Sequence, residues 1–143
     1  MYGALDISTG GMIAQRTRLE VITANIANLE TLRDAQGNLS PYRRRIALFA
    51  AGDPAALEPH ARSLGVHVAA IETDKSPLQP GKYDPDSPDA YKSGPFKGYV
   101  ASTNINPLVE QVNALDATRA YEANAVAAEA TKQMINTALR LLA

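Results

Sequence analysis

The residues of this chain with the most potential for chemistry are its two histidines and one aspartate-rich stretch. His60 and His67 are the only histidines. Neither has neighbours at the spacing of a metal-ligand set, so we expect both to be surface or strand residues. Residues 84–89 read Asp-Pro-Asp-Ser-Pro-Asp, which alternates oxygen ligands but lacks the glycine and the distal glutamate of a calcium loop. We therefore expect no metal site.

Other catalytic patterns are equally weak. No glycine-rich phosphate loop, nucleophile elbow or paired-carboxylate arrangement stands out. The chain has no cysteine, which excludes disulfides and thiol chemistry. An enzyme is therefore the least favoured class of function, and the sequence predicts no catalytic residue, no cofactor and no small-molecule substrate.

Charge and hydropathy exclude two further classes. With 14 basic and 15 acidic residues the net charge is −1, so no global field attracts nucleic acid or an anionic membrane. Arg43, Arg44 and Arg45 are consecutive, but in a neutral chain such a patch is more often solvated or protein-facing than bound to phosphate. No apolar run approaches the ~20 residues of a membrane span. The N-terminus lacks the regions of a Sec signal peptide, so any export is expected to use another route.

The N-terminal segment, 5–29, is predicted to be a helix with an apolar seam at positions a and d of a heptad repeat. The first two d positions are exceptions, because they hold the polar residues Ser8 and Gln15. Gly10 and Gly11 each weaken a helix by ~1 kcal/mol relative to alanine, so we expect a firm helix only from Met12 onward. Apolar residues on the far side, such as Val21, indicate contact on both faces. The predicted seam consists of Leu5, Met12, Leu19, Ile22, Ile26 and Leu29.

The middle of the chain, 31–103, has a different character. Residues 34–38 are a turn signal, and 42–50, 64–72 and 98–102 are candidate strands. Between the last two, residues 76–95 contain five prolines. Such a density excludes helix and central strand and predicts an extended loop.

The C-terminal segment, 108–143, is predicted to be a helix that begins at an asparagine cap, Asn106, followed by Pro107. Eight alanines between 114 and 130 favour the helix and permit close approach of a second one. Its main apolar stripe consists of Leu108, Val112, Leu115, Ala123, Val126, Ala130, Met134 and Leu141. The opposite side carries Tyr121, Ile135, Leu139 and Leu142.

Arg119 lies within the main stripe, three residues before Glu122. An arginine on an apolar surface needs a partner when it is buried. That partner is either Glu122 or a residue across a subunit boundary, and the sequence leaves both open.

These elements predict an α+β fold. The N- and C-terminal helices, in segments 1–30 and 104–143, pair as an antiparallel coiled coil, and segment 31–103 forms a small domain rich in strands and loops. Apolar residues at both ends of the chain favour helices that bind other copies or relatives of the chain. We expect the seam residues and both sides of the C-terminal helix, Arg119 included, to form that assembly surface.

Specific stretches resemble the bacterial flagellar rod and hook proteins. Residues 8–28, STGGMIAQRTRLEVITANIAN, are similar to the N-terminal signature of that family, and residues 118–124, TRAYEAN, to its C-terminal signature. The resemblance covers nearly the whole chain in the expected order. Middle stretches similar to the proximal-rod members are YRR at 42–44, GVHV at 65–68, YDPDSPDA at 83–90, GYV at 98–100 and NINP at 104–107.

The resemblance implies a structural rod subunit. Its terminal helices would pack around a central export channel, with the middle segment as an outer β domain, and helical polymerisation would build a rod in the periplasmic space that transmits torque. Implied partners are other copies of the chain, the rod proteins FlgB, FlgF, FlgG and FliE, and the flagellar type III export apparatus. A soluble helical adaptor or flagellar export chaperone is the alternative from another class.

Overall fold

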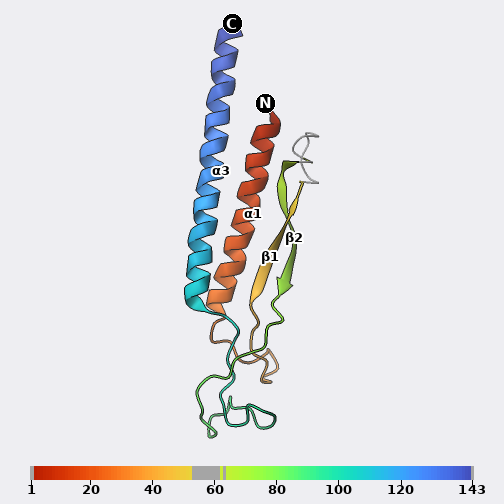
Figure 1. Cartoon of the computed structure of the whole chain (residues 1–143), viewed down its shortest axis with the longest axis vertical. Coiled ribbons are helices and arrows are strands. Elements are labelled where there is room, and N and C mark those ends of the chain that lie inside the picture. The colour runs from red at the N-terminus through yellow and green to blue at the C-terminus, as the bar shows by residue number, and fades with distance from the viewer. Residues whose placement is uncertain (1, 53–61, 63, 143) are drawn as a thin grey trace.

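Two long helices and a two-stranded hairpin make up the regular structure. The computed structural model describes residues 2–52, 62 and 64–142, and of residues 2 and 142 only the backbone. The elements are α1 (Tyr2–Ala27), β1 (Arg45–Ala51), β2 (Val66–Thr73) and α3 (Pro107–Leu142). In Figure 1, α1 stands between α3 and the hairpin, and it contacts both. The loops gather at the end of the molecule opposite the C-terminus.

Helix α1 is continuous through its glycine pair, in contrast to the expectation of a firm helix only from Met12. It begins at Tyr2. The physical reason is packing against α3, because a Cβ atom built on Gly11 would lie only 2.7 Å from Oδ1 of Asn124. Glycine therefore allows the close approach of the two helices, and the contact that results offsets its poor helix propensity.

The other face of α1 packs on the hairpin. Val21 and Ile22 are buried and line a cleft together with Ile46 and Phe49 of β1. Contact on both faces of α1 was expected from the sequence, and the helix has neighbours on two sides. Ile13, another apolar residue on the side of the helix away from the predicted seam, is 60% exposed, so that side is covered only in part.

The hairpin is antiparallel and has one irregularity. Its register runs from Arg45 opposite Thr73 to Ala51 opposite Val66, with a shift between Leu48 and Phe49. Such a bulge interrupts the two-residue alternation, which explains why both Leu48 and Phe49 are exposed.

The third strand predicted at 98–102 is not a regular strand. Tyr99 and Val100 form only isolated antiparallel pairs, with Tyr83 and Ala90. The proline-rich stretch is an ordered loop of extended segments and turns, as its composition predicts. Prolines remove backbone donors, so the pairing cannot extend into a continuous ladder.

Helix α3 runs antiparallel to α1. Oδ1 of Asn106 accepts a hydrogen bond from the backbone N–H of Leu108 at 3.0 Å, so the predicted cap and start of the helix are confirmed. Asn25 near the end of α1 contacts Glu110 near the start of α3, whereas Gly11 faces Asn124. The fold is thus α+β, with the two terminal helices packed together and a small antiparallel sheet between them in sequence. No helix among the described residues is long and apolar enough to cross a membrane.

Candidate assembly surface and the polar junction beneath it

A buried asparagine joins the end of α1 to the starts of β1 and α3. Oδ1 of Asn25 accepts from the backbone N–H of Arg45 at 2.9 Å. Its Nδ2 donates to the carbonyl oxygen of Arg45 at 2.8 Å and to Oε2 of Glu110 at 2.9 Å. Both donors and the acceptor of the amide are in use, so its orientation is fixed by its partners.

Glu110 is the most deeply buried charged residue of this junction, with its side chain 1% exposed. Its Oε1 accepts from Nε of Arg44 at 2.9 Å, and a second guanidinium nitrogen lies 2.8 Å away. It also sits in the first turn of α3, where the helix dipole stabilises a carboxylate. The buried charge is therefore compensated by Arg44, by Asn25 and by the helix itself.

Arg44 extends the junction to the chain that follows β2. Its backbone N–H donates to Oδ1 of Asn104 at 2.7 Å, and its guanidinium lies 4.0 Å from Oδ2 of Asp74. The hydroxyl and then the backbone N–H of Ser76 hold the pKa of Asp74 below its usual value, and the charges of Arg44 and Arg43 add to this effect, whereas partial desolvation opposes it. Such bonds favour the ionised carboxylate.

The junction orients segments and has no catalytic arrangement. It ties together the end of α1, the start of β1, the chain after β2 and the first turn of α3. Among the residues that the structure describes, no group of three histidine, cysteine, aspartate or glutamate side chains can hold a metal ion. His67 lies in β2 with Nδ1 2.6 Å from the carbonyl oxygen of Gly52; His60 falls outside the described residues.

The predicted seam of α1 lies at the margin of the contact with α3. Ile22 is buried, but Leu5, Met12, Leu19 and Leu29 are only half-buried and Ile26 is exposed. The centre of the contact is formed by residues with small or polar side chains. On α1 and α3 these are Ser8, Gly11, Asn25, Glu110, Ala117 and Asn124.

The main stripe of α3 does not pack on α1. Its six large apolar side chains are between 51% and 83% exposed. Close packing of two helix backbones requires small residues at the contact, and the alanine-rich face of α3 supplies them. The exposed residues are Leu108, Val112, Leu115, Val126, Met134 and Leu141.

The remaining residues of α3 that were predicted to take part in assembly differ in their exposure to solvent. Tyr121 and Leu139 are exposed, whereas Ile135 is half-buried. The side chain of Leu142 lies outside the described part of the chain. The part that all these residues play in assembly stays a prediction.

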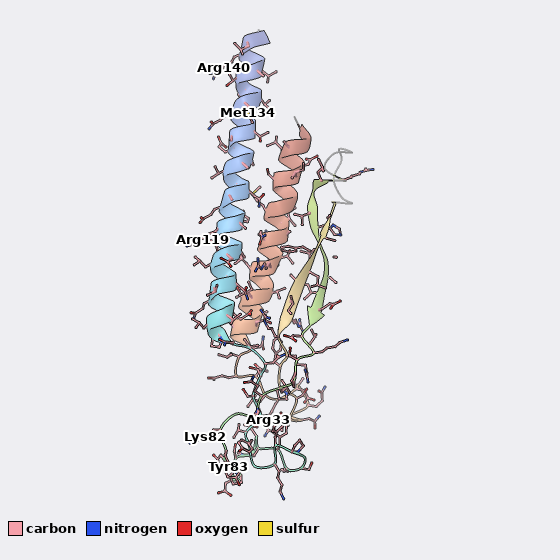
Figure 2. The ribbon with its side chains drawn as sticks, in the orientation of Figure 1. Arg33, Lys82, Tyr83, Arg119, Met134 and Arg140 are labelled. Atoms are coloured by element: carbon pink, nitrogen blue, oxygen red, sulfur yellow. The ribbon has the colours of Figure 1, made fainter. Side chains whose placement is uncertain are left out.

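Arg119 is exposed on the side of α3 that faces away from α1 (Figure 2). The ion pairs found among the described residues do not include one between Arg119 and Glu122. Pairing with Glu122 is therefore not present in the structure, whereas pairing across a subunit boundary stays a prediction.

Sequence reasoning found the arginine patch but missed its partners. Arg44 is protein-facing, and Arg43 donates to the carbonyl oxygen of Ser76 at 3.0 Å. Asn25 and Glu110 were not singled out. Two signals could have found them: a polar residue within the apolar periodicity of α1, and a glutamate one turn after a helix cap.

Comparison with known proteins identifies both ends of the chain. The family model described as "Flagella basal body rod protein" matches residues 5–33. The model described as "Flagellar basal body rod FlgEFG protein C-terminal" matches residues 97–141. These two matches cover α1 and α3, the helices that carry the candidate assembly surface.

Curated relatives match over almost the full length. The flagellar basal-body rod protein FlgC of Borreliella burgdorferi is 40% identical over 154 aligned positions, which cover 99% of this chain and 97% of the relative. FlgC of Bacillus subtilis is 35% identical, with 98% and 97% covered. FlgC of Escherichia coli O157:H7 is 32% identical, with 99% and 97% covered.

Proposed function

Because the chain belongs to the FlgC family of flagellar basal-body rod proteins and is a structural subunit of the rod, not an enzyme, we propose that it polymerises through the outer faces of its terminal helices. In this proposal α1 and α3 associate as a coiled coil and enclose the export channel. The hairpin and loops form the outer part of the subunit, and the assembled rod transmits torque.

The observation that carries this proposal is the exposed main stripe of α3. Its six large apolar residues face solvent along the helix. An isolated chain gains nothing from this exposure, whereas burial of each such side chain is worth about 1.5–3 kcal/mol. Large apolar side chains that recur exposed along one side of a helix support a protein interface there.

The composition of the contact between α1 and α3 also supports this proposal. Its centre consists of small and polar side chains, and Oε1 of Gln15 on α1 is buried without a hydrogen-bond partner among the described residues. Such a contact contributes little hydrophobic stabilisation to the isolated chain. In the proposal, most of the apolar burial of the helices occurs when subunits join.

Location and partners follow from the same proposal. The subunit resides in the periplasmic part of the basal body and travels there through the flagellar type III export apparatus rather than by a Sec signal. Its neighbours in the rod are copies of itself and the rod proteins FlgB, FlgF, FlgG and FliE. Family membership favours this subunit over a soluble adaptor or export chaperone.

The test introduces a charge into the stripe. Val126→Glu should leave the purified chain folded, because Val126 is 69% exposed, but it should abolish soft-agar motility and incorporation into basal bodies. Thr118→Glu, an exposed site on the same helix outside the stripe, should keep motility. Val68→Glu, in the half-buried part of β2, should instead damage the fold, which circular dichroism detects. A motile Val126→Glu strain with normal basal bodies would overturn the proposal.

A further inference from the structure

The loop end of the molecule contains a hollow whose lining residues all lie between positions 83 and 98. Its volume is about 350 Å³. Figure 2 shows Tyr83, one of the lining residues, at the end of the molecule opposite the C-terminal part of α3. This loop hollow is therefore separate from the exposed stripe of α3. Its lining includes Tyr83, Ala90, Tyr91, Lys92, Lys97 and Gly98.

The backbone holds the loop hollow in shape. Gly98 is buried between two other passes of the chain. Its N–H donates to the carbonyl oxygen of Tyr91 at 3.0 Å, and its carbonyl oxygen accepts from the N–H of Asp84 at 2.9 Å. A Cβ atom at Gly98 would lie only 2.8 Å from the ring of Tyr83, so the absence of a side chain keeps this space open. The hollow is thus formed before any ligand binds.

Aromatic rings are concentrated at this end of the molecule. The chain has six tyrosines and two phenylalanines, and half of them gather here in two pairs. The ring centroids of Tyr83 and Tyr99 are 5.1 Å apart, and those of Tyr91 and Phe96 are 6.4 Å apart. Tyr83 is nevertheless 60% exposed and Phe96 41%. Exposed rings that gather in this way favour a binding surface, because their apolar area stays in contact with water.

The charged groups of the lining are positive. Lys92 and Lys97 are both exposed, and the ion pairs found among the described residues do not include either lysine. The nearby carboxylate of Asp89 is already paired with Arg33 at 2.7 Å. Two ammonium groups beside aromatic rings favour a ligand that combines negative charge with an apolar face.

The surrounding charges favour a ligand of low charge density. Asp84 and Asp86 are exposed in the same loop, outside the lining of the hollow. They repel a dense polyanion such as nucleic acid, whose binding depends on several cations that neutralise phosphates. A glycan with scattered carboxylates needs only the two lysines. The C–H face of a sugar ring packs on an aromatic ring, and its hydroxyls bond to phenol and ammonium groups.

We propose that the loop hollow binds a glycan that carries carboxylates, and that the source of this glycan is the cell wall. A sugar ring packs on Tyr83, while Lys92 and Lys97 bind a carboxylate. The recognition of a carboxylated glycan rests on the hollow alone. The cell wall as its source rests on the periplasmic location in the proposed function.

Calorimetric titration of the purified full chain tests the recognition. The probe is a short oligosaccharide of alternating glucuronate and N-acetylglucosamine, and the neutral comparison is an oligomer of N-acetylglucosamine alone. We expect the charged probe to bind about tenfold more tightly, which is the factor that one charge-assisted hydrogen bond supplies. Absence of binding by the charged probe would overturn the proposal, as would tighter binding of a single-stranded DNA oligonucleotide.

Variants of the lining separate the two kinds of contact. Lys97→Ala should weaken binding of the charged probe by about tenfold and leave the neutral one unchanged, whereas Tyr83→Ala should weaken both. Lys82→Ala is the matched control, because Lys82 is an exposed lysine of the same loop outside the lining. Equal affinities of Lys97→Ala and Lys82→Ala for the charged probe would overturn the site.

Co-sedimentation with purified cell-wall sacculi tests the source. The wild-type chain and Lys82→Ala should sediment with the sacculi, whereas the double variant Lys92→Ala with Lys97→Ala should stay in the supernatant. Sacculi with amidated carboxylates should lose the wild-type chain. A wild-type chain that binds the oligosaccharide but not the sacculi would overturn the cell wall as source. These outcomes leave the rod function standing, because its failure would appear as a motile strain that carries Val126→Glu.

Discussion

Replacing Glu110 by alanine tests whether the polar junction holds the helices to the hairpin. Glu110 accepts hydrogen bonds from Arg44 at 2.9 Å and from Asn25 at 2.9 Å, with its side chain 1% exposed. Removal of the carboxylate leaves the guanidinium without its nearest counter-charge and frees one hydrogen of the buried amide.

The magnitude follows from the burial of each partner. Breaking a fully buried ion pair costs about 3–5 kcal/mol. Arg44 is 25% exposed and retains Asp74 at 4.0 Å, which lowers this part of the cost. Asn25 loses one hydrogen bond, worth about 1 kcal/mol. We expect Glu110→Ala to reduce the free energy of unfolding by about 2–4 kcal/mol and Tm by about 6–12 °C.

Thermal and urea denaturation followed by circular dichroism measures this loss. The matched control is Glu122→Ala, an exposed glutamate on the same helix, which should change the free energy of unfolding little. The double variant Glu110→Leu with Arg44→Met removes both charges and should recover much of the loss, because two apolar partners leave no buried charge uncompensated. A Tm for Glu110→Ala equal to that of Glu122→Ala would refute the reasoning.

Three further predictions concern contacts elsewhere in the chain. Gly11→Ala should destabilise the chain, because its Cβ would lie 2.7 Å from Oδ1 of Asn124. In an Asn124→Ala background the same change should stabilise it by up to about 1 kcal/mol, as alanine is the better helix former, and urea denaturation reports both. Gly98→Ala should cost more than about 1 kcal/mol, measured by thermal melting, because the residue has φ +82° and its Cβ would meet a tyrosine ring at 2.8 Å. Ser76→Ala should raise the pKa of Asp74 towards its ordinary value, as NMR titration would show. A lowered folded-state pKa contributes stability above the ordinary pKa of an aspartate and loses it as pH falls through the folded value, so the wild-type advantage should vanish in acid.

Each of these predictions has a result that would contradict it. If Gly11→Ala destabilises equally in both backgrounds, the contact with Asn124 is not the cause. Gly94, with φ +89° and open space around it, is the control for Gly98, and equal costs for the two alanine variants would exclude a steric clash. An unchanged Asp74 titration in Ser76→Ala would mean that Ser76 does not hold the pKa down.

The sequence by itself determined the two helices, the two strands of the hairpin and the family. Heptad periodicity located α1, the Asn106–Pro107 cap located the start of α3, and the density of proline excluded regular structure from 76–95. These features depend on local propensities and on spacing along one segment. The residues at the two ends of the chain were also sufficient to reveal the resemblance to flagellar rod proteins, which the comparisons confirm.

Only the tertiary structure decided which faces meet. Large apolar side chains predict burial but not the partner, and the stripe of Leu115 and Val126 faces solvent and not α1. The real contact uses Gly11 and Ala117, because small residues let helix backbones come close. Glu110 is likewise buried only because Arg44 and Asn25 reach it from segments far apart in the chain, and such a convergence leaves no local signal in the sequence.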